Sequence, residues 1–80
     1  MVKNDYKLIE ITSEFITLGQ FLKFSDVINN GGEAKEFIFN HKIVIDGIEN
    51  KQRGKKLYPG TKIEIDDKLF FEIKKWLSIK

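Results

Sequence analysis

The chain contains no cysteine, one histidine and one proline, and these scarcities exclude several classes of protein. Without cysteine it cannot form a disulfide, a thiolate nucleophile, an iron–sulfur cluster or a zinc site built from Cys/His pairs. The longest apolar runs are three residues, at positions 37–39, 43–45 and 69–71, far shorter than a signal-peptide core or a membrane span. We therefore expect a cytoplasmic protein with no metal site and no membrane segment.

Eighty residues suffice for one hydrophobic core and leave nothing for a second, so we expect a single domain over residues 1–80. Hydrophobic residues make up 41% of the chain and charged residues 32%, a balance that is typical of a folded globule. Since neither a disulfide nor a metal assists this small core, most aromatic side chains are expected to fill the interior.

Charge is unevenly distributed along the chain. The net charge is only +2 and the pI is 8.9, just below the range that by itself indicates a nucleic-acid binder. Residues 41–62, however, hold six lysines and arginines against two carboxylates, a local net charge of +4, and the remainder is mildly acidic. Such an uneven field can orient a polyanion.

Periodicity and turn residues predict an α+β fold of two short helices on a small, mostly antiparallel sheet. The expected helices, residues 18–25 and 33–40, each follow a capping pattern, Thr17 with Gln20 and Asn30 with Glu33. The expected strands are residues 7–11, 42–45, 62–65 and 69–73. The chain end is ambiguous, because Ile73, Trp76 and Leu77 also fit a helical turn.

Three turn signals separate the expected strands. Asp46-Gly47 favours a tight hairpin turn, and Tyr58-Pro59-Gly60 places proline and glycine in the order that a type II turn requires. Asp66-Asp67 is interpreted as a third turn. These signals indicate consecutive antiparallel strands.

Gly31 and Gly32 precede the second expected helix and allow two interpretations. Free backbone N–H groups at a helix start could bind a phosphate where no Cβ obstructs its approach. Alternatively, the glycines form a tight turn between helices and Glu33 completes a cap. The second interpretation is favoured for this motif alone, because no established phosphate-binding glycine motif matches.

Residues 51–56, Lys-Gln-Arg-Gly-Lys-Lys, form the densest basic run. Gly54 lets the backbone turn so that the flanking cations converge on one side, where Lys51, Arg53, Lys55 and Lys56 could bind successive phosphates. The competing interpretation is a solvated loop whose lysines only confer solubility. The position between two strands and the nearby Lys42 favour the first.

Few residues remain for other chemistry. Phe39, Tyr58 and Trp76 could stack on a nucleobase, and Phe39 is expected to be the most exposed of the aromatics. His41 follows the second helix and is interpreted as a helix-terminal cation or C-cap residue. No nucleophile–base pair or phosphate loop is recognisable, so we expect no enzymatic activity, no cofactor and no small-molecule substrate.

Four blocks between Ile16 and Ile65 resemble the RNA-binding domain named for small-subunit ribosomal protein four, the alpha-L domain. They are Ile-Thr-Leu-Gly-Gln-Phe-Leu-Lys at 16–23, Gly-Gly-Glu-Ala-Lys at 31–35, Lys-Ile-Val-Ile-Asp-Gly at 42–47 and Arg-Gly-Lys-Lys-Leu-Tyr-Pro-Gly at 53–60. Their order and spacing are similar to those of the small stand-alone bacterial members, the YaaA/YbcJ kind. Residues 74–80 lie beyond the resemblance.

The resemblance implies two helices packed on a small sheet, with RNA held at the start of the second helix and by the basic loop. Together with the basic run, it predicts these RNA-binding residues: Gly31, Gly32, Lys35, Lys42, Lys51, Arg53, Gly54, Lys55 and Lys56.

The expected function is therefore binding of structured RNA, ribosomal RNA or tRNA, by a monomer on or near the ribosome. Two alternatives stay open. The chain could be an adaptor that docks a protein through the sheet or the Trp76 tail, with an incidental basic loop. It could also be an accessory module that once served a larger RNA-modifying enzyme.

Overall fold

The computed structural model describes residues 6–76. The chain begins with two strands and two helices, the second helix preceded by a 3-10 turn: β1 (Lys7–Ile11), β2 (Ile16–Thr17), α1 (Leu18–Phe24), η1 (Gly31–Glu33) and α2 (Ala34–Asn40). Five strands follow: β3 (Ile43–Ile45), β4 (Ile48–Glu49), β5 (Lys56–Leu57), β6 (Lys62–Ile65) and β7 (Leu69–Lys75). The α+β prediction is confirmed.

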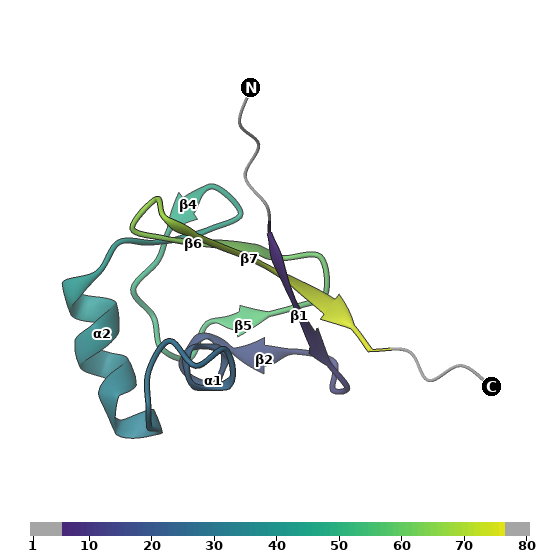
Figure 1. The fold of residues 1–80 in the computed structure, drawn as a ribbon, viewed down its shortest axis with the longest axis horizontal. Helices are drawn as coiled ribbons and strands as arrows, with labels where there is room; N and C mark the ends of the chain where they lie inside the picture. The colour runs from purple at the N-terminus through teal and green to yellow at the C-terminus, as the bar shows by residue number, and fades with distance from the viewer. Residues whose placement is uncertain (1–5, 77–80) are drawn as a thin grey trace.

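The strands form two sheets (Figure 1). The larger has the order β1-β7-β6-β3-β4, and the smaller pairs β2 with β5. All pairs are antiparallel except β1 with β7, where Ile9 lies opposite Ile73 in a parallel register. This parallel pair joins the two ends of the described chain and brings the first strand to the edge of a sheet formed by later residues.

One face of the larger sheet forms the core with the helices, because buried isoleucines occupy every second position in β1, β3 and β6. Both helices and the β2–β5 pair lie on this side, with α2 on the left of Figure 1. Phe21 of α1 meets Phe71 of β7 edge to face, with ring centroids 5.1 Å apart. The fully buried side chains of the core are Leu18, Phe21, Leu22, Ile43, Leu57, Ile63, Ile65 and Ile73.

The first helix begins as the sequence predicts. The Thr17 hydroxyl accepts a hydrogen bond from the Gln20 backbone N–H at 3.3 Å, and the Gln20 side chain accepts one from the Thr17 N–H at 3.1 Å. This capping box is confirmed. The helix ends at Phe24 and not at Ser25, whose hydroxyl donates to the Phe21 carbonyl at 2.8 Å and caps the last turn.

Two of the predicted turns have the expected backbone. Asp46 and Gly47 have φ of 51° and 86°, which is the left-handed pair that a tight hairpin turn needs. Gly60 has φ of 99°, and the Thr61 N–H donates to the Tyr58 carbonyl at 2.9 Å, as in a type II turn. Both predictions are confirmed.

The alternative of a helical turn near the chain end is wrong for the described residues. β7 continues through Ile73 to Lys75, and the Trp76 N–H then donates to the Ile11 carbonyl at 2.8 Å. The parallel neighbour β1 supplies this extension of the strand. Leu77 lies outside the described residues. Within residues 6–76 no helix is long and apolar enough to cross a membrane.

Candidate nucleic-acid interface

The basic loop between β4 and β5 is attached to the start of α1. Its carbonyls accept hydrogen bonds from two N–H groups that the first helical turn leaves without a partner: Leu18 N–H donates to Lys55 O at 2.8 Å, and Gly19 N–H donates to Arg53 O at 2.9 Å. The loop is thus held to α1 by its backbone, and the side chains of Arg53 and Lys55 are exposed.

Arg53 passes directly over Gly19. A Cβ placed on Gly19 would lie 2.7 Å from the Arg53 Cγ, closer than real Cβ contacts. Because Gly19 is buried and has no side chain, the aliphatic part of Arg53 can rest on the helix while its guanidinium reaches solvent.

A hollow of about 300 Å³ lies beside this contact. Its lining joins α1, the start of η1 and α2, and the loop: Thr17, Gly19, Gln20, Lys23, Gly31, Ala34, Arg53 and Gly54. Lys23 and Arg53 are exposed, and no carboxylate belongs to the lining. We call this hollow the basic groove. It joins three of the predicted residues, Gly31, Arg53 and Gly54, from distant parts of the chain.

The glycine pair is mainly a turn and a cap. Asn30 Oδ1 accepts from the Gly32 N–H at 2.9 Å, and the Glu33 carboxylate accepts from the Asn29 N–H at 3.1 Å. The turn is a separate 3-10 segment, so α2 starts at Ala34 and not at Glu33 as the sequence predicts. The Glu33 N–H also donates to the Asn30 carbonyl at 3.1 Å, so two of the N–H groups at this helix start are already engaged, which supports the interpretation as a turn.

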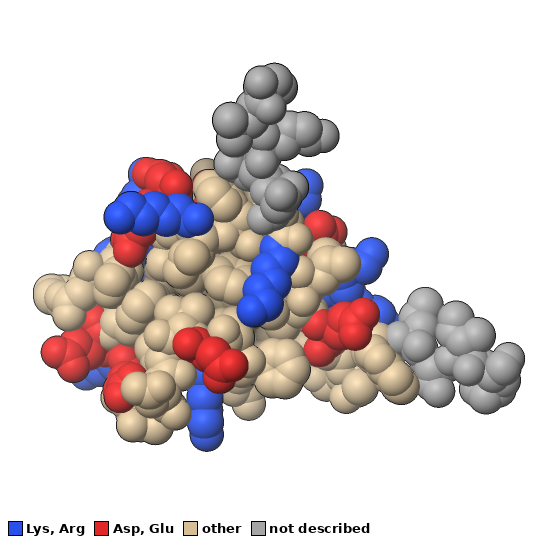
Figure 2. Space-filling model, in the orientation of Figure 1, with Lys and Arg blue, Asp and Glu red and all other residues tan. Residues whose placement is uncertain are grey.

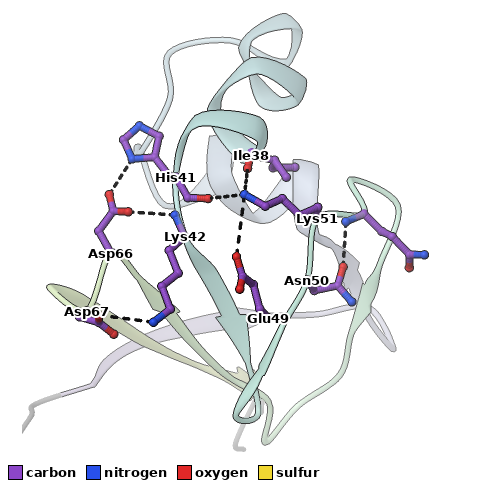
Figure 3. Close-up of polar contacts among 9 residues, drawn as sticks. Ile38, His41, Lys42, Glu49, Asn50, Lys51, Asp66 and Asp67 are labelled. Carbon is purple, nitrogen blue, oxygen red and sulfur yellow. Dashed lines mark hydrogen bonds and ion pairs between the residues drawn. The ribbon is translucent and has the colours of Figure 1, made fainter.

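Lys35 and Lys51 line a second hollow, of about 500 Å³, beside α2. Lys35 is exposed, whereas the Lys51 ammonium donates to the carbonyls of Ile38 at 3.3 Å and His41 at 3.1 Å (Figure 3). A cation in this position neutralises the negative end of the helix. Lys51 therefore has a structural role at the end of α2, and we call its surroundings the α2 hollow.

Lys42 is engaged elsewhere. Its ammonium lies 3.6 Å from Asp67 Oδ2, on the side of β3 away from Lys51 in Figure 3. Its backbone N–H donates to Asp66 Oδ1 at 2.9 Å. Asp66 and Asp67 have φ of 54° and 55°, so the predicted third turn is present, and Lys42 is one of its contacts.

His41 caps the C-terminus of α2, as predicted, and also pairs with Asp66. Its ring stacks on Phe37 with centroids 4.0 Å apart, and its Nδ1 lies 2.6 Å from Asp66 Oδ2. The hydrogen bond from His41, followed by that from the Lys42 N–H, lowers the pKa of Asp66 below its ordinary value. This pairing joins the end of α2 to the turn between β6 and β7.

Lys55 and Lys56 lie on a third side of the loop. Both line a hollow that also contains Asp46 and Tyr58, and the Lys56 ammonium lies 4.9 Å from the centroid of the Phe15 ring. The basic run thus distributes its cations over three hollows. Lys51 lines the α2 hollow, Arg53 lines the basic groove, and Lys55 and Lys56 line the hollow beside β4.

Charged side chains of both signs are also scattered over the face shown in Figure 2, and no continuous basic area covers it. The basic groove and the α2 hollow adjoin one another, since Gly31 and Ala34 line the first while Gly32 and Lys35 line the second. Of the nine predicted residues, these two hollows unite six: Gly31, Gly32, Lys35, Lys51, Arg53 and Gly54.

Sequence reasoning did not assign five members of the groove to the RNA-binding site: Thr17, Gly19, Gln20, Lys23 and Ala34. Lys23 lies one helical turn after Gln20, so both are on the face of α1 that the loop approaches. The helical periodicity contained that signal. The need for glycine at position 19 appears only once Arg53 is seen against it.

Comparison with known proteins identifies the family of the chain. The sequence profile of the S4 domain matches residues 9–73. The chain is also 48% identical over 58 residues to the probable ribosome maturation protein RlbA of Bacillus subtilis (strain 168), a match that spans 72% of this chain and 82% of that protein. The profile covers most of the chain, from β1 to β7, and the relative matches over most of its own length. The chain therefore belongs to the S4 domain family.

Proposed function

We propose that this protein binds structured RNA, ribosomal RNA or tRNA on or near the ribosome, and that it acts by binding alone. The printed name of its Bacillus subtilis relative, a probable ribosome maturation protein, supports the ribosomal context. The proposal rests on the basic groove, whose lining contains Lys23, Arg53 and three glycines and no carboxylate.

Lysine and arginine contribute affinity for RNA through its phosphates. Within residues 6–76 no ion pair engages the five cations nearest the loop and helix starts: Lys23, Lys35, Arg53, Lys55 and Lys56. Lys42 and Lys51 contribute less, because Asp67 and the end of α2 already bind them. About five phosphate contacts correspond to a slope of roughly −3 to −4 in a plot of log affinity against log salt.

The glycines of the groove would let a ribose-phosphate strand approach the backbone closely. A Cβ on Gly31 or Gly54 would meet nothing within 4 Å, so both positions face open space. A surface of this kind reads the path of a strand more than the identity of its bases, which suits structured RNA.

The test is retention of extracted ribosomal RNA on filters by the full chain, from low to high KCl. We expect strong retention at low salt that falls steeply above physiological salt. The matched variants are Arg53→Ala and Lys74→Ala, which remove the same charge; Lys74 lies near the end of β7, at the opposite side of the molecule from α2 in Figure 1. Equal retention at all salt concentrations, or equal losses for both variants, would contradict the proposal.

A second candidate is docking of a protein through the outer sheet face, favoured by the exposed Leu8 on β1 and Trp76 after β7. The two functions differ in their response to RNase. An RNA binder that co-sediments with ribosomal particles is released when the RNA is digested, whereas an adaptor stays with its protein partner.

A further inference from the structure

We infer that the α2 hollow binds one unpaired nucleobase of the RNA, stacked on Phe39, with the adjoining phosphate held by Lys35. This inference rests on the proposed function and specifies what one part of its surface recognises. The hollow is lined by Gly32, Lys35, Glu36, Ile38, Phe39 and Lys51.

The exposure of Phe39 is not explained by the packing of the core. Its side chain is 78% exposed, the highest value among the large apolar side chains of residues 6–76. An aromatic ring exposed to water forgoes the stabilisation that burial in the core would give. The buried positions of α2 are Ala34 and Ile38. The ring therefore contributes little to the core, and a base can reach its face.

The position of Phe39 on α2 pairs it with a cation. Lys35 is four residues earlier, so the two side chains lie one turn apart on the same helical face. No ion pair occupies Lys35 within the part of the chain that the structure describes. Side chains four residues apart on a helix have Cβ atoms about 5–6 Å from each other, so one nucleotide could place its base on the ring and its phosphate on the ammonium.

Lys51 supplies the opposite wall. Its ammonium is fixed by the carbonyls of Ile38 and His41, so its aliphatic chain is held beside the hollow. A side chain that is already ordered loses less entropy when a ligand packs against it. The volume of about 500 Å³ lies in the range of sites that accept small organic groups.

Glu36 determines the orientation. A carboxylate repels phosphate and only accepts hydrogen bonds, so its partner on a base is an N–H donor, either an exocyclic amino group or a ring imino group. The phosphate is thus directed toward Lys35. The hollow adjoins the basic groove through η1, so one RNA strand could occupy both. This continuity favours RNA over a protein ligand.

The test uses extracted ribosomal RNA as the probe and compares Phe39→Ala, Phe39→Tyr and Lys35→Ala across a KCl series. Loss of one stacked base is expected to weaken retention roughly 5- to 100-fold in Phe39→Ala, with an unchanged salt slope, because stacking releases no counterions. Phe39→Tyr should retain affinity near that of the wild type, and Lys35→Ala should reduce the slope. Thermal unfolding serves as the folding control. Because Phe39 is exposed, Phe39→Ala is expected to unfold at the same temperature as the wild type.

Irradiation at 254 nm followed by mass spectrometry gives an independent readout. We expect a nucleotide adduct on Phe39 itself and its loss in Phe39→Ala. If RNA is retained with a steep salt slope but Phe39→Ala equals wild type, the nucleobase site is wrong and the proposed function stands. If no RNA is retained at any salt concentration, both fail. If Phe39→Ala loses a captured protein and keeps RNA affinity, the hollow is a protein dock and the inference is overturned.

Discussion

Gly19 lies beneath Arg53, so that a single added Cβ would come within 2.7 Å of the arginine Cγ. The same two residues share a backbone hydrogen bond of 2.9 Å. A residue in the first turn of α1 thus determines the position of a cation more than thirty positions later in the sequence. The basic groove therefore forms only when α1 and the loop pack together, and none of its residues indicates it alone.

Gly19→Ala is expected to displace the Arg53 side chain while the fold persists, because alanine favours a helix and the obstruction is a flexible side chain. RNA retention should fall several-fold, and the free energy of unfolding should change by less than about 1 kcal/mol. A double-mutant cycle provides the check: Gly19→Ala should have little further effect on retention in an Arg53→Ala background. Independent, additive losses would contradict the contact.

Asp66→Asn is expected to remove an acid-sensitive part of stability. The pKa of Asp66 is lowered in the folded state, chiefly by the His41 hydrogen bond, so folding favours the ionised carboxylate. The ionised carboxylate therefore contributes to folding stability at pH values above the pKa of Asp66 in the unfolded chain, near 4. This contribution is lost as the pH falls through the lower pKa of the folded state. Asparagine tolerates the positive φ of this position, which keeps the turn intact.

Urea unfolding from pH 2 to 7 measures this effect. The stability of the wild type should exceed that of Asp66→Asn at neutral pH, and the gap should narrow toward the acid end. Asp67→Asn, with nearly the same φ and no contact to His41, is the matched control. A gap that stays constant over the whole pH range would exclude the proposed linkage.

Gly54→Ala is expected to affect RNA retention, whereas Gly60→Ala is expected to affect stability. Gly60 has φ of 99°, which costs alanine roughly 1–2 kcal/mol, so this variant is expected to unfold at lower urea. Gly54 faces open space without a positive φ, so its alanine variant should keep wild-type stability and lose RNA retention where the strand approaches the backbone. Undiminished retention by Gly54→Ala would remove Gly54 from the interface.

Lys51→Ala is expected to lower the free energy of unfolding by about 1 kcal/mol, since it removes a cation bonded to two carbonyls at the end of α2. Lys35 belongs to α2 but makes no such contacts, so Lys35→Ala should leave the free energy of unfolding unchanged. Chemical denaturation of both variants checks the difference, and equal stability would show that the C-terminal contacts of Lys51 are energetically unimportant.

Local chemistry made much of the fold predictable. The capping box of Thr17 and Gln20 and the turn at Asp46-Gly47 depend only on residues within a few positions of one another. The parallel pairing of β1 with β7 was not predicted, because it joins residues more than sixty positions apart and no short motif encodes it. The continuation of β7 to Lys75 has the same origin, since β1 supplies its partner there.

The candidate site was predictable in its composition and less so in its arrangement. Sequence alone identified the basic run, but not that Arg53 turns to α1 while Lys55 and Lys56 turn toward Tyr58. The engagement of Lys42 by Asp67 was also hidden, because it depends on a turn twenty-five residues away. Charge in a sequence therefore indicates affinity for a polyanion, whereas the fold decides which cations share a surface.

The decisive measurement is the salt slope of ribosomal RNA retention for wild type and for the Lys23→Ala/Arg53→Ala double variant. Removing two phosphate contacts should make the slope shallower by about 1.4 to 1.8 and reduce affinity at every salt concentration. Lys74→Ala should leave the slope unchanged. A double variant with the wild-type slope and affinity would mean that the basic groove between α1 and the loop does not bind RNA.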